Sequence, residues 1–128
     1  MLTEGPATQF TDLRECLEDF QQRFNTNGRV RKLVKNWDRQ VMVEATDTGA
    51  VYTMHIEDAQ LQRIDEGRPD GGDDEYLVHL QATNETLMEI FSGNYNPSTA
   101  LLDGMLSVFS NERDKVKLEA CAMVIWGL

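Results

Sequence analysis

Residues 84–109 carry the most structural information in this chain and read NETLMEIFSGNYNPSTALLDGMLSVF. The first part has apolar side chains at helical spacing, namely Leu87, Ile90 and Phe91. Thr83 or Asn84 is suited to cap this helix, and Gly93 is a natural stop. The pattern therefore predicts a short helix that ends at Gly93.

A second short helix and a strand follow in the same stretch. Pro97 fits the first turn of the helix and Gly104 its end, while residues 104–109 are strand-like. Helices of about two turns are not stable alone in water. We therefore expect both to pack their large apolar side chains on a sheet.

The run from Leu87 to Val108 resembles the sterol carrier protein type two (SCP2) domain. In that family a helix ending in Gly, an Asn-Pro turn, a helix, a Gly and a short strand come in this order and spacing. The first half of the chain matches only in its order of elements, and Ser110 stands where the family usually has Gly. The resemblance implies an apolar tunnel between sheet and helices that holds a sterol, a fatty acyl chain or another lipid.

Length and composition predict one globular domain. The chain has 128 residues, of which 41% are hydrophobic, and we expect a flexible lead-in at residues 1–7 and a single domain at 8–128. It has no apolar run near the roughly 20 residues of a membrane span and no signal-peptide pattern, which predicts a cytoplasmic protein. Cys16 and Cys121 are isolated in apolar helical contexts, which favours buried free thiols.

The formal net charge of -10 argues against nucleic-acid binding, which needs clustered cations. An acidic surface mainly promotes solubility. The acidic group Asp70, Asp73, Asp74 and Glu75 lacks the ligand spacing of a calcium loop and predicts a solvated turn. His55 and His79 have no catalytic motif around them. We predict no metal and no cofactor.

Two helices are predicted before the first strand. The first has an apolar stripe of Phe10, Leu13, Leu17, Phe20 and Phe24, with Thr8 or Thr11 as its cap. The second has Val30, Leu33, Val34 and Trp37 at helical spacing. Its cations are Arg29, Arg31, Lys32, Lys35 and Arg39. They form either a solvated face or a docking patch for anionic membrane, with Trp37 as interfacial anchor.

Period-two patterns predict the sheet. Residues 41–45 and 51–56 form a hairpin around Asp47-Thr48-Gly49, residues 61–64 a weaker strand and residues 76–82 a fourth strand. With residues 104–109 the prediction is an α+β domain of about five mainly antiparallel strands, with helices on one face.

Residues 111–128 predict a terminal helix whose last two turns are almost entirely apolar. Such a helix covers an apolar surface as a lid, fills the core, or forms a homodimer face. The predicted tunnel walls are Phe10, Phe20, Phe24, Leu87, Phe91, Leu101, Met105, Met123 and Trp126. An empty tunnel of roughly 300 Å³ would cost about 7 kcal/mol, so we expect it to be filled by ligand or partly collapsed by this helix.

These patterns favour a non-catalytic lipid-binding or transfer protein. The alternative is a protein-interaction or homodimerisation module that uses the apolar terminal helix. An enzyme ranks third, because no catalytic constellation accompanies the resemblance.

Overall fold

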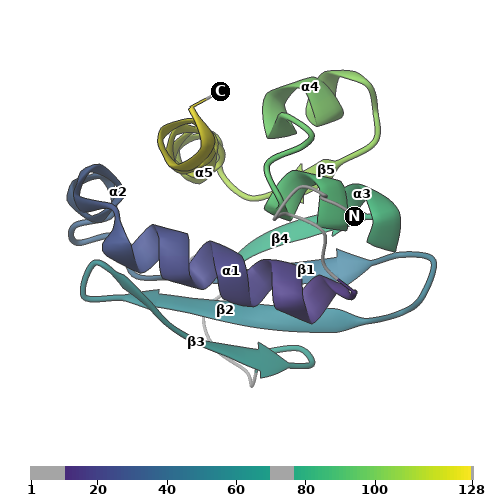
Figure 1. The fold of residues 1–128 in the computed structure, drawn as a ribbon, viewed down its shortest axis with the longest axis horizontal. Coiled ribbons are helices and arrows are strands. Elements are labelled where there is room, and N and C mark those ends of the chain that lie inside the picture. Colours follow the sequence, from purple (N-terminus) through teal and green to yellow (C-terminus); the bar gives the residue numbers. More distant parts are fainter. Residues whose placement is uncertain (1–10, 70–76, 128) are drawn as a thin grey trace, which may run out of the picture.

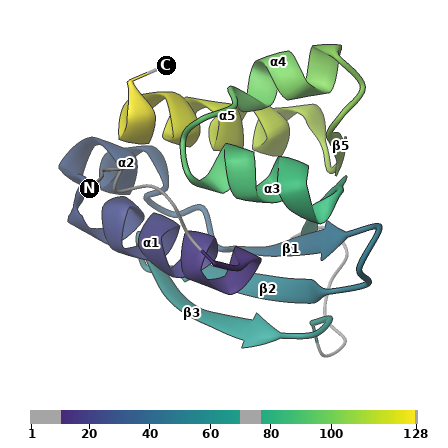
Figure 2. The ribbon, with the colours of Figure 1, turned by 45° about the vertical axis from the view of Figure 1, so that its right-hand side comes forward.

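The computed structural model describes residues 11–69 and 77–127 and has a single five-stranded sheet with helices on one face (Figure 1). The elements in chain order are α1 (Leu13–Thr26), α2 (Gly28–Leu33), β1 (Arg39–Ala45), β2 (Val51–Glu57), β3 (Gln60–Glu66), β4 (Leu77–Ala82), α3 (Asn84–Phe91), α4 (Pro97–Leu102), β5 (Ser107–Phe109) and α5 (Glu112–Trp126). Figure 2 shows α1, α3 and α5 on the same side of the strands, with α4 farther from the sheet than α3. The predicted α+β class is confirmed.

The sheet has the order β3-β2-β1-β4-β5. Three of its pairings are antiparallel, and β1 pairs with β4 in parallel, with Val41 opposite Val78 and Val43 opposite Leu80. The prediction of a mainly antiparallel sheet is therefore confirmed.

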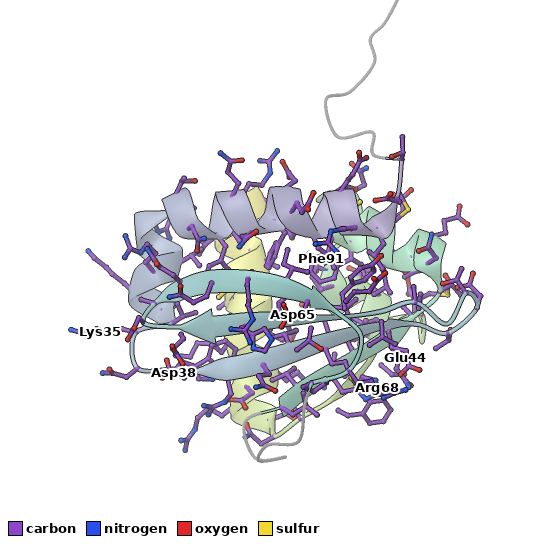
Figure 3. All side chains as sticks on the ribbon, turned by 90° about the horizontal axis from the view of Figure 1, so that it is seen from below. Lys35, Asp38, Glu44, Asp65, Arg68 and Phe91 are labelled. Atoms are coloured by element: carbon purple, nitrogen blue, oxygen red, sulfur yellow. The ribbon has the colours of Figure 1, made fainter. Side chains whose placement is uncertain are left out.

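Alternation along β1 separates the two faces of the sheet. Val41, Val43 and Ala45 are fully buried and belong to the same core as the apolar stripe of α1. Glu44 lies on the other face, which none of the helices in the described residues covers (Figure 3). The helices and this inner face together form the hydrophobic core.

The cap of α1 differs from the prediction. Asp12 is the N-cap, and its side chain accepts a hydrogen bond from the Glu15 N–H at 2.9 Å. Thr11 lies one residue earlier and donates through both its N–H and its hydroxyl to the Glu15 carboxylate. The predicted cap at Thr11 is wrong, because the Asp12 carboxylate is already in position. The other candidate, Thr8, lies outside the described residues.

The second helix is shorter than predicted. Asn27 caps α2, which ends at Leu33, and Asn36 has a φ of +61° that turns the chain toward β1. Trp37 therefore lies beyond the helix. β3 is longer than the predicted residues 61–64, and β5 is confined to three residues.

The segment from α3 to β5 follows the predicted pattern closely. Thr83 caps α3, and Asn96 caps α4 with Pro97 in its first turn. Gly93 and Gly104 follow the two helices with φ of +84° and +76°. The lead-in at residues 1–7, Phe10 and the acidic group at residues 70–75 lie outside the described residues.

Candidate functional site

An aromatic cluster lies where α1, α3 and α5 meet. The Phe20 ring is 5.2 Å from that of Phe91, 5.8 Å from that of Phe24 and 5.6 Å from that of Trp126, between ring centroids. Phe20, Phe24 and Phe91 are at most 5% exposed. The stripe of α1 thus supplies the centre of an aromatic wall that α5 completes.

Beside this cluster is an apolar cavity of about 50 Å³. It lies between α3, α4, β5 and α5. Its lining consists of Phe20, Leu80, Ile90, Phe91, Pro97, Leu101, Leu106, Val108, Lys115, Leu118, Glu119, Ala122 and Trp126.

Four of the predicted wall residues line this cavity, namely Phe20, Phe91, Leu101 and Trp126. Phe24 and Leu87 are fully buried in the core and do not reach it. Met105 and Met123 were wrongly predicted, because they are 47% and 49% exposed. Phe10 lies outside the described residues.

The two methionines point outward for different reasons. The chain reverses at Gly104, and the Met105 N–H bonds back to the Ala100 carbonyl at 2.9 Å, so Met105 no longer follows the helical stripe of α4. Met123 shares the outer face of α5 with Val116, which is 57% exposed.

Several lining residues were missed. Ile90 is on α3, Val108 on β5, and Leu118 and Ala122 on α5, while Leu106 lies in the loop before β5. Leu118 and Ala122 are four residues apart on α5, as positions on one helix face should be, but the apolar residues all around that helix obscure this signal.

The cavity is too small for a lipid. Ligand pockets usually have volumes of about 300–1,000 Å³, and 50 Å³ holds only a few water molecules. At about 24 cal/mol per Å³, a void of this size costs only about 1 kcal/mol. In the described part of the chain, the space between α5 and the sheet is therefore nearly closed.

Trp126 is packed against Gly93. A Cβ atom at position 93 would lie 2.5 Å from Trp126 Cδ1 and 2.7 Å from Nε1, so only glycine fits beside the indole. The indole N–H is buried and has no hydrogen-bond acceptor among the described residues. A buried polar group without a partner is uncommon and needs a physical explanation.

A buried polar group holds the opposite end of α5. Asp114 is fully buried and accepts hydrogen bonds from Trp37 Nε1 at 2.7 Å and Arg39 Nε at 2.9 Å. Asn111 caps the helix and also donates to Asp114 at 3.2 Å. This Trp37–Arg39–Asp114 group connects the start of α5 to the start of β1.

The same contacts correct the prediction for Trp37. Its side chain is 5% exposed and its indole is committed to Asp114. Trp37 is thus a core residue in this structure, and the prediction of an interfacial membrane anchor is wrong.

Of the five cations predicted to form the docking patch, Arg39 is partly buried and paired with Asp114, and the other four are exposed. Arg29, Arg31, Lys32 and Lys35 form no ion pair in the described part of the chain. Lys35 projects away from the body of the protein in Figure 3. The helix α2 that carries three of these cations packs against α5. Positive charge thus lies next to the helix that closes the cavity.

The open face of the sheet carries polar groups that pair with each other. His79 Nε2 lies 2.8 Å and Gln81 Nε2 2.9 Å from Glu44 Oε1, and Arg68 lies 3.3 Å from Glu44 Oε2 (Figure 3). The hydrogen bonds from Gln81 and His79 lower the pKa of Glu44. No sequence motif predicts this group, because its members come together only through strand pairing.

A second group on this face joins His55 to Asp65, with 2.9 Å between Nε2 and Oδ2. Arg63 lies 2.9 Å from the same Asp65 oxygen, and its hydrogen bond is the main cause of the lowered pKa of Asp65. Both histidines thus lie beside a carboxylate, but His55 Nε2 is buried and has no hydrogen-bond partner of good geometry among the described residues.

Cys16 and Cys121 are free and fully buried. Burial raises the pKa of Cys16 to about 11 and that of Cys121 to about 12. Both thiols are therefore protonated at neutral pH and are poor nucleophiles and metal ligands. No three His, Cys, Asp or Glu side chains converge on a possible metal site within residues 11–69 and 77–127.

No protein-family model and no curated protein matches the sequence. Solved structures share the fold. Sterol carrier protein 2 superposes with a TM-score of 0.63 at 13% identity, over 92% of this chain and 97% of that chain. Palmitated SCP2L2 from Aedes aegypti has a TM-score of 0.62 at 15% identity, over 88% of this chain and 95% of that chain.

The sec-alkyl sulfatase PisA1 contains the same fold in one part. A double mutant of it gives a TM-score of 0.63 at 15% identity, over 84% of this chain but only 15% of that chain. The chain therefore has the sterol carrier protein 2 fold, as the resemblance at residues 87–108 implied.

Proposed function

We propose that this chain, which has the sterol carrier protein 2 fold, is a non-catalytic lipid carrier. Its ligand, a sterol, a fatty acyl chain or a similar lipid, occupies an enlarged form of the cavity between α3, α4, β5 and α5. The observation that carries the proposal is an apolar cavity with an aromatic wall, closed on one side by the partly buried face of a terminal helix. The structural similarity to sterol carrier protein 2 and to palmitated SCP2L2 supports the lipid class.

The energetics of burial favour such an opening. Each methylene removed from water contributes about 0.8 kcal/mol, so a chain of about 12 methylenes supplies up to roughly 10 kcal/mol. Moving α5 outward exposes only part of a helix face, since Cys121 and Ala122 are its buried apolar residues in the described part of the chain. Lipid burial therefore offsets the cost of opening.

The two ends of α5 differ in a way that suits a lid. Its start is held by the buried ionic contacts of Asp114. Its last turns are held in place by apolar contacts with the core. Apolar contacts with a bound lipid can replace them. We expect the Trp126 end to move and the Asp114 end to remain in place.

Membrane docking belongs to the same proposal. The exposed cations Arg29, Arg31, Lys32 and Lys35 would meet an anionic surface and bring α5, against which α2 packs, close to the bilayer. No helix in the described residues is long and apolar enough to span a membrane, so contact would be peripheral. A cytoplasmic location remains a prediction.

The first test is thermal stability with lipid. A ligand at 100 times its dissociation constant adds about 2.7 kcal/mol if it binds only the folded state, which raises Tm by roughly 10 °C for a domain of this size. Fatty acyl chains, acyl-CoA and a sterol should be measured by calorimetry. Native mass spectrometry of gently purified protein would then identify the natural ligand.

A matched pair of variants on α5 tests whether the lipid binds in this cavity. Ala122 lines the cavity and Ala120 does not, although both are on α5. Ala122→Leu should fill the space and abolish the Tm increase, while Ala120→Leu should retain it. Absence of any shift for the wild type with all three lipid classes would overturn the carrier proposal. The homodimer alternative remains a prediction, and sedimentation of the lipid-free protein tests it.

A further inference from the structure

The two tryptophans of this chain have contrasting environments. Trp37 is buried and donates its indole N–H to Asp114 at 2.7 Å. The indole N–H of Trp126 is also buried, but it has no acceptor in the described part of the chain. Leaving such a donor unpaired is destabilising, because folding removes it from water without replacing the hydrogen bond.

The residue that carries the unpaired N–H, Trp126, belongs to the cavity wall. Trp126 lines the cavity together with Phe20, Phe91 and Leu101. A Cβ atom at Gly93 would lie over the face of the five-membered ring, 2.5 to 2.8 Å from Cδ1, Nε1 and Cγ. Glycine at position 93 thus leaves room for this face of the indole.

The surrounding chemistry limits what kind of acceptor belongs there. The cavity lining is apolar except for Lys115 and Glu119, and these two are already engaged. Lys115 Nζ lies 3.8 Å from Glu112, and Glu119 accepts a hydrogen bond from Ser98 at 2.7 Å. A buried carboxylate at Trp126 would have one neutral donor and a large desolvation cost. An uncharged oxygen costs much less to remove from water.

We infer that Trp126 is the ligand's hydrogen-bond donor, and that the cavity selects a lipid with an uncharged acceptor oxygen, such as an ester, ketone or hydroxyl oxygen, over a plain hydrocarbon. This inference rests on the proposed function and specifies its ligand class. The apolar walls bind the hydrocarbon part, and the indole N–H fixes where the oxygen lies. A site that pairs a buried donor with the ligand discriminates against analogues that lack the acceptor.

The test compares 2-undecanone with undecane, both delivered from cyclodextrin to the full chain. In ¹H–¹⁵N spectra the Trp126 indole proton should move downfield with the ketone and much less with the alkane. The Trp37 indole serves as internal control, since its bond to Asp114 remains. Trp126→Phe assigns the two signals and keeps an aromatic ring in the wall.

The second measurement compares the affinities of wild type and Trp126→Phe for the two ligands. Trp126→Phe should weaken ketone binding by up to about tenfold, as expected for one hydrogen bond, and leave alkane binding nearly unchanged. If both ligands bind but the Trp126 signal responds equally to each and the variant weakens both alike, the inference is wrong and the carrier function stands. If neither ligand nor any lipid binds the wild type, the proposed function itself fails. Should the variant not fold, the wild-type spectra decide by whether either indole signal moves farther downfield with the ketone than with the alkane.

Discussion

At the scale of single residues, Gly93 is constrained twice. Its φ of +84° lies in the left-handed region, and a Cβ there would lie 2.5 Å from the Trp126 indole. Gly104 has a similar φ of +76° but open space around its Cα. The two glycines therefore separate the cost of backbone strain from the cost of displacing Trp126.

We expect Gly93→Ala to lower the free energy of unfolding by about 2–4 kcal/mol, and Gly104→Ala by about 1 kcal/mol. The difference reflects the overlap with the indole. Urea denaturation of both variants measures it, and Trp126 fluorescence should change only in the first. Equal losses in the two variants would show that the indole has room to move.

Gly93 and Met105 show what the local sequence pattern can and cannot predict. The helix stop at Gly93 was predictable, because the apolar spacing ends there. Its contact with Trp126 was not, since the two residues are far apart in sequence and meet only when α5 packs on the α3–α4 connection. Met105 was misplaced for a related reason: helical spacing continues in the sequence beyond Gly104, but the helix itself ends at Leu102.

At the scale of elements, the position of α5 depends on Asp114. The carboxylate is fully buried and receives hydrogen bonds from Trp37, Arg39 and Asn111. Removing one member of a buried ion pair typically costs 3–5 kcal/mol, because the other charge remains without compensation. Arg39 is 16% exposed at its side chain, so water moderates this cost.

We therefore predict that Asp114→Asn lowers the free energy of unfolding by about 2–4 kcal/mol. Glu112→Gln is the matched control, because Glu112 is on the same helix turn, 79% exposed, and 3.8 Å from Lys115. It should change stability by no more than about 0.5 kcal/mol. Chemical denaturation measures both. A small loss for Asp114→Asn would mean that apolar packing alone holds α5.

The group around Glu44 on the open face of the sheet leads to a prediction about how stability depends on pH. Hydrogen bonds from Gln81 and His79, with the charge of Arg68, lower the pKa of Glu44 from its ordinary 4.5. Such a carboxylate stabilises the folded protein when ionised. Its contribution is complete above about pH 4.5 and is lost as the pH falls through the lower folded value.

Glu44→Gln should therefore flatten the stability curve on acidification below about pH 5, so that wild type and variant converge at low pH. Glu85→Gln, an exposed change on α3, serves as control and should leave the shape of the curve unchanged. Thermal unfolding across the acid range gives the comparison. Parallel curves for wild type and Glu44→Gln would contradict the assignment.

The individual strands and helices were easier to predict from the sequence than their arrangement in space. Period-two alternation located β1, β2 and β4, because each has one face in the core. The parallel pairing of β1 with β4 has no sequence signal of its own, and the Glu44–His79 contact follows from that pairing. The cavity was anticipated as an apolar space under the terminal helix, but its small volume depends on how closely that helix packs.

At the scale of the whole molecule, charge is unevenly distributed. The formal net charge is -10, yet Arg29, Arg31, Lys32 and Lys35 lie within seven residues on and after α2. An acidic protein is repelled by an anionic membrane at long range, so any docking must orient this local positive surface toward the bilayer. At 0.1 M salt the Debye length is about 10 Å, which makes the nearest charges dominate.

The last prediction separates the effect of the cation patch on lipid transfer from the effect of the net charge. Reversal of Arg31, Lys32 and Lys35 to Glu changes the net charge from -10 to -16, since each reversal adds two negative charges to the original total. Reversal of Arg14, Arg63 and Arg113, three exposed cations on α1, β3 and α5, makes the same change elsewhere. Each patch cation contributes about 1 kcal/mol near an anionic surface. The first variant should therefore slow lipid transfer to anionic vesicles roughly tenfold or more, with unchanged lipid affinity in solution.

Transfer should be followed by a fluorescent acyl lipid, with vesicles of neutral lipid as reference. The slowing should shrink as salt is raised, because screening weakens the attraction that the wild type has and the variant lacks. The control triple should transfer lipid at close to the wild-type rate. Equal slowing in both triples would assign the effect to net charge, and no slowing in either would mean that the cations are only a solvated face beside α5.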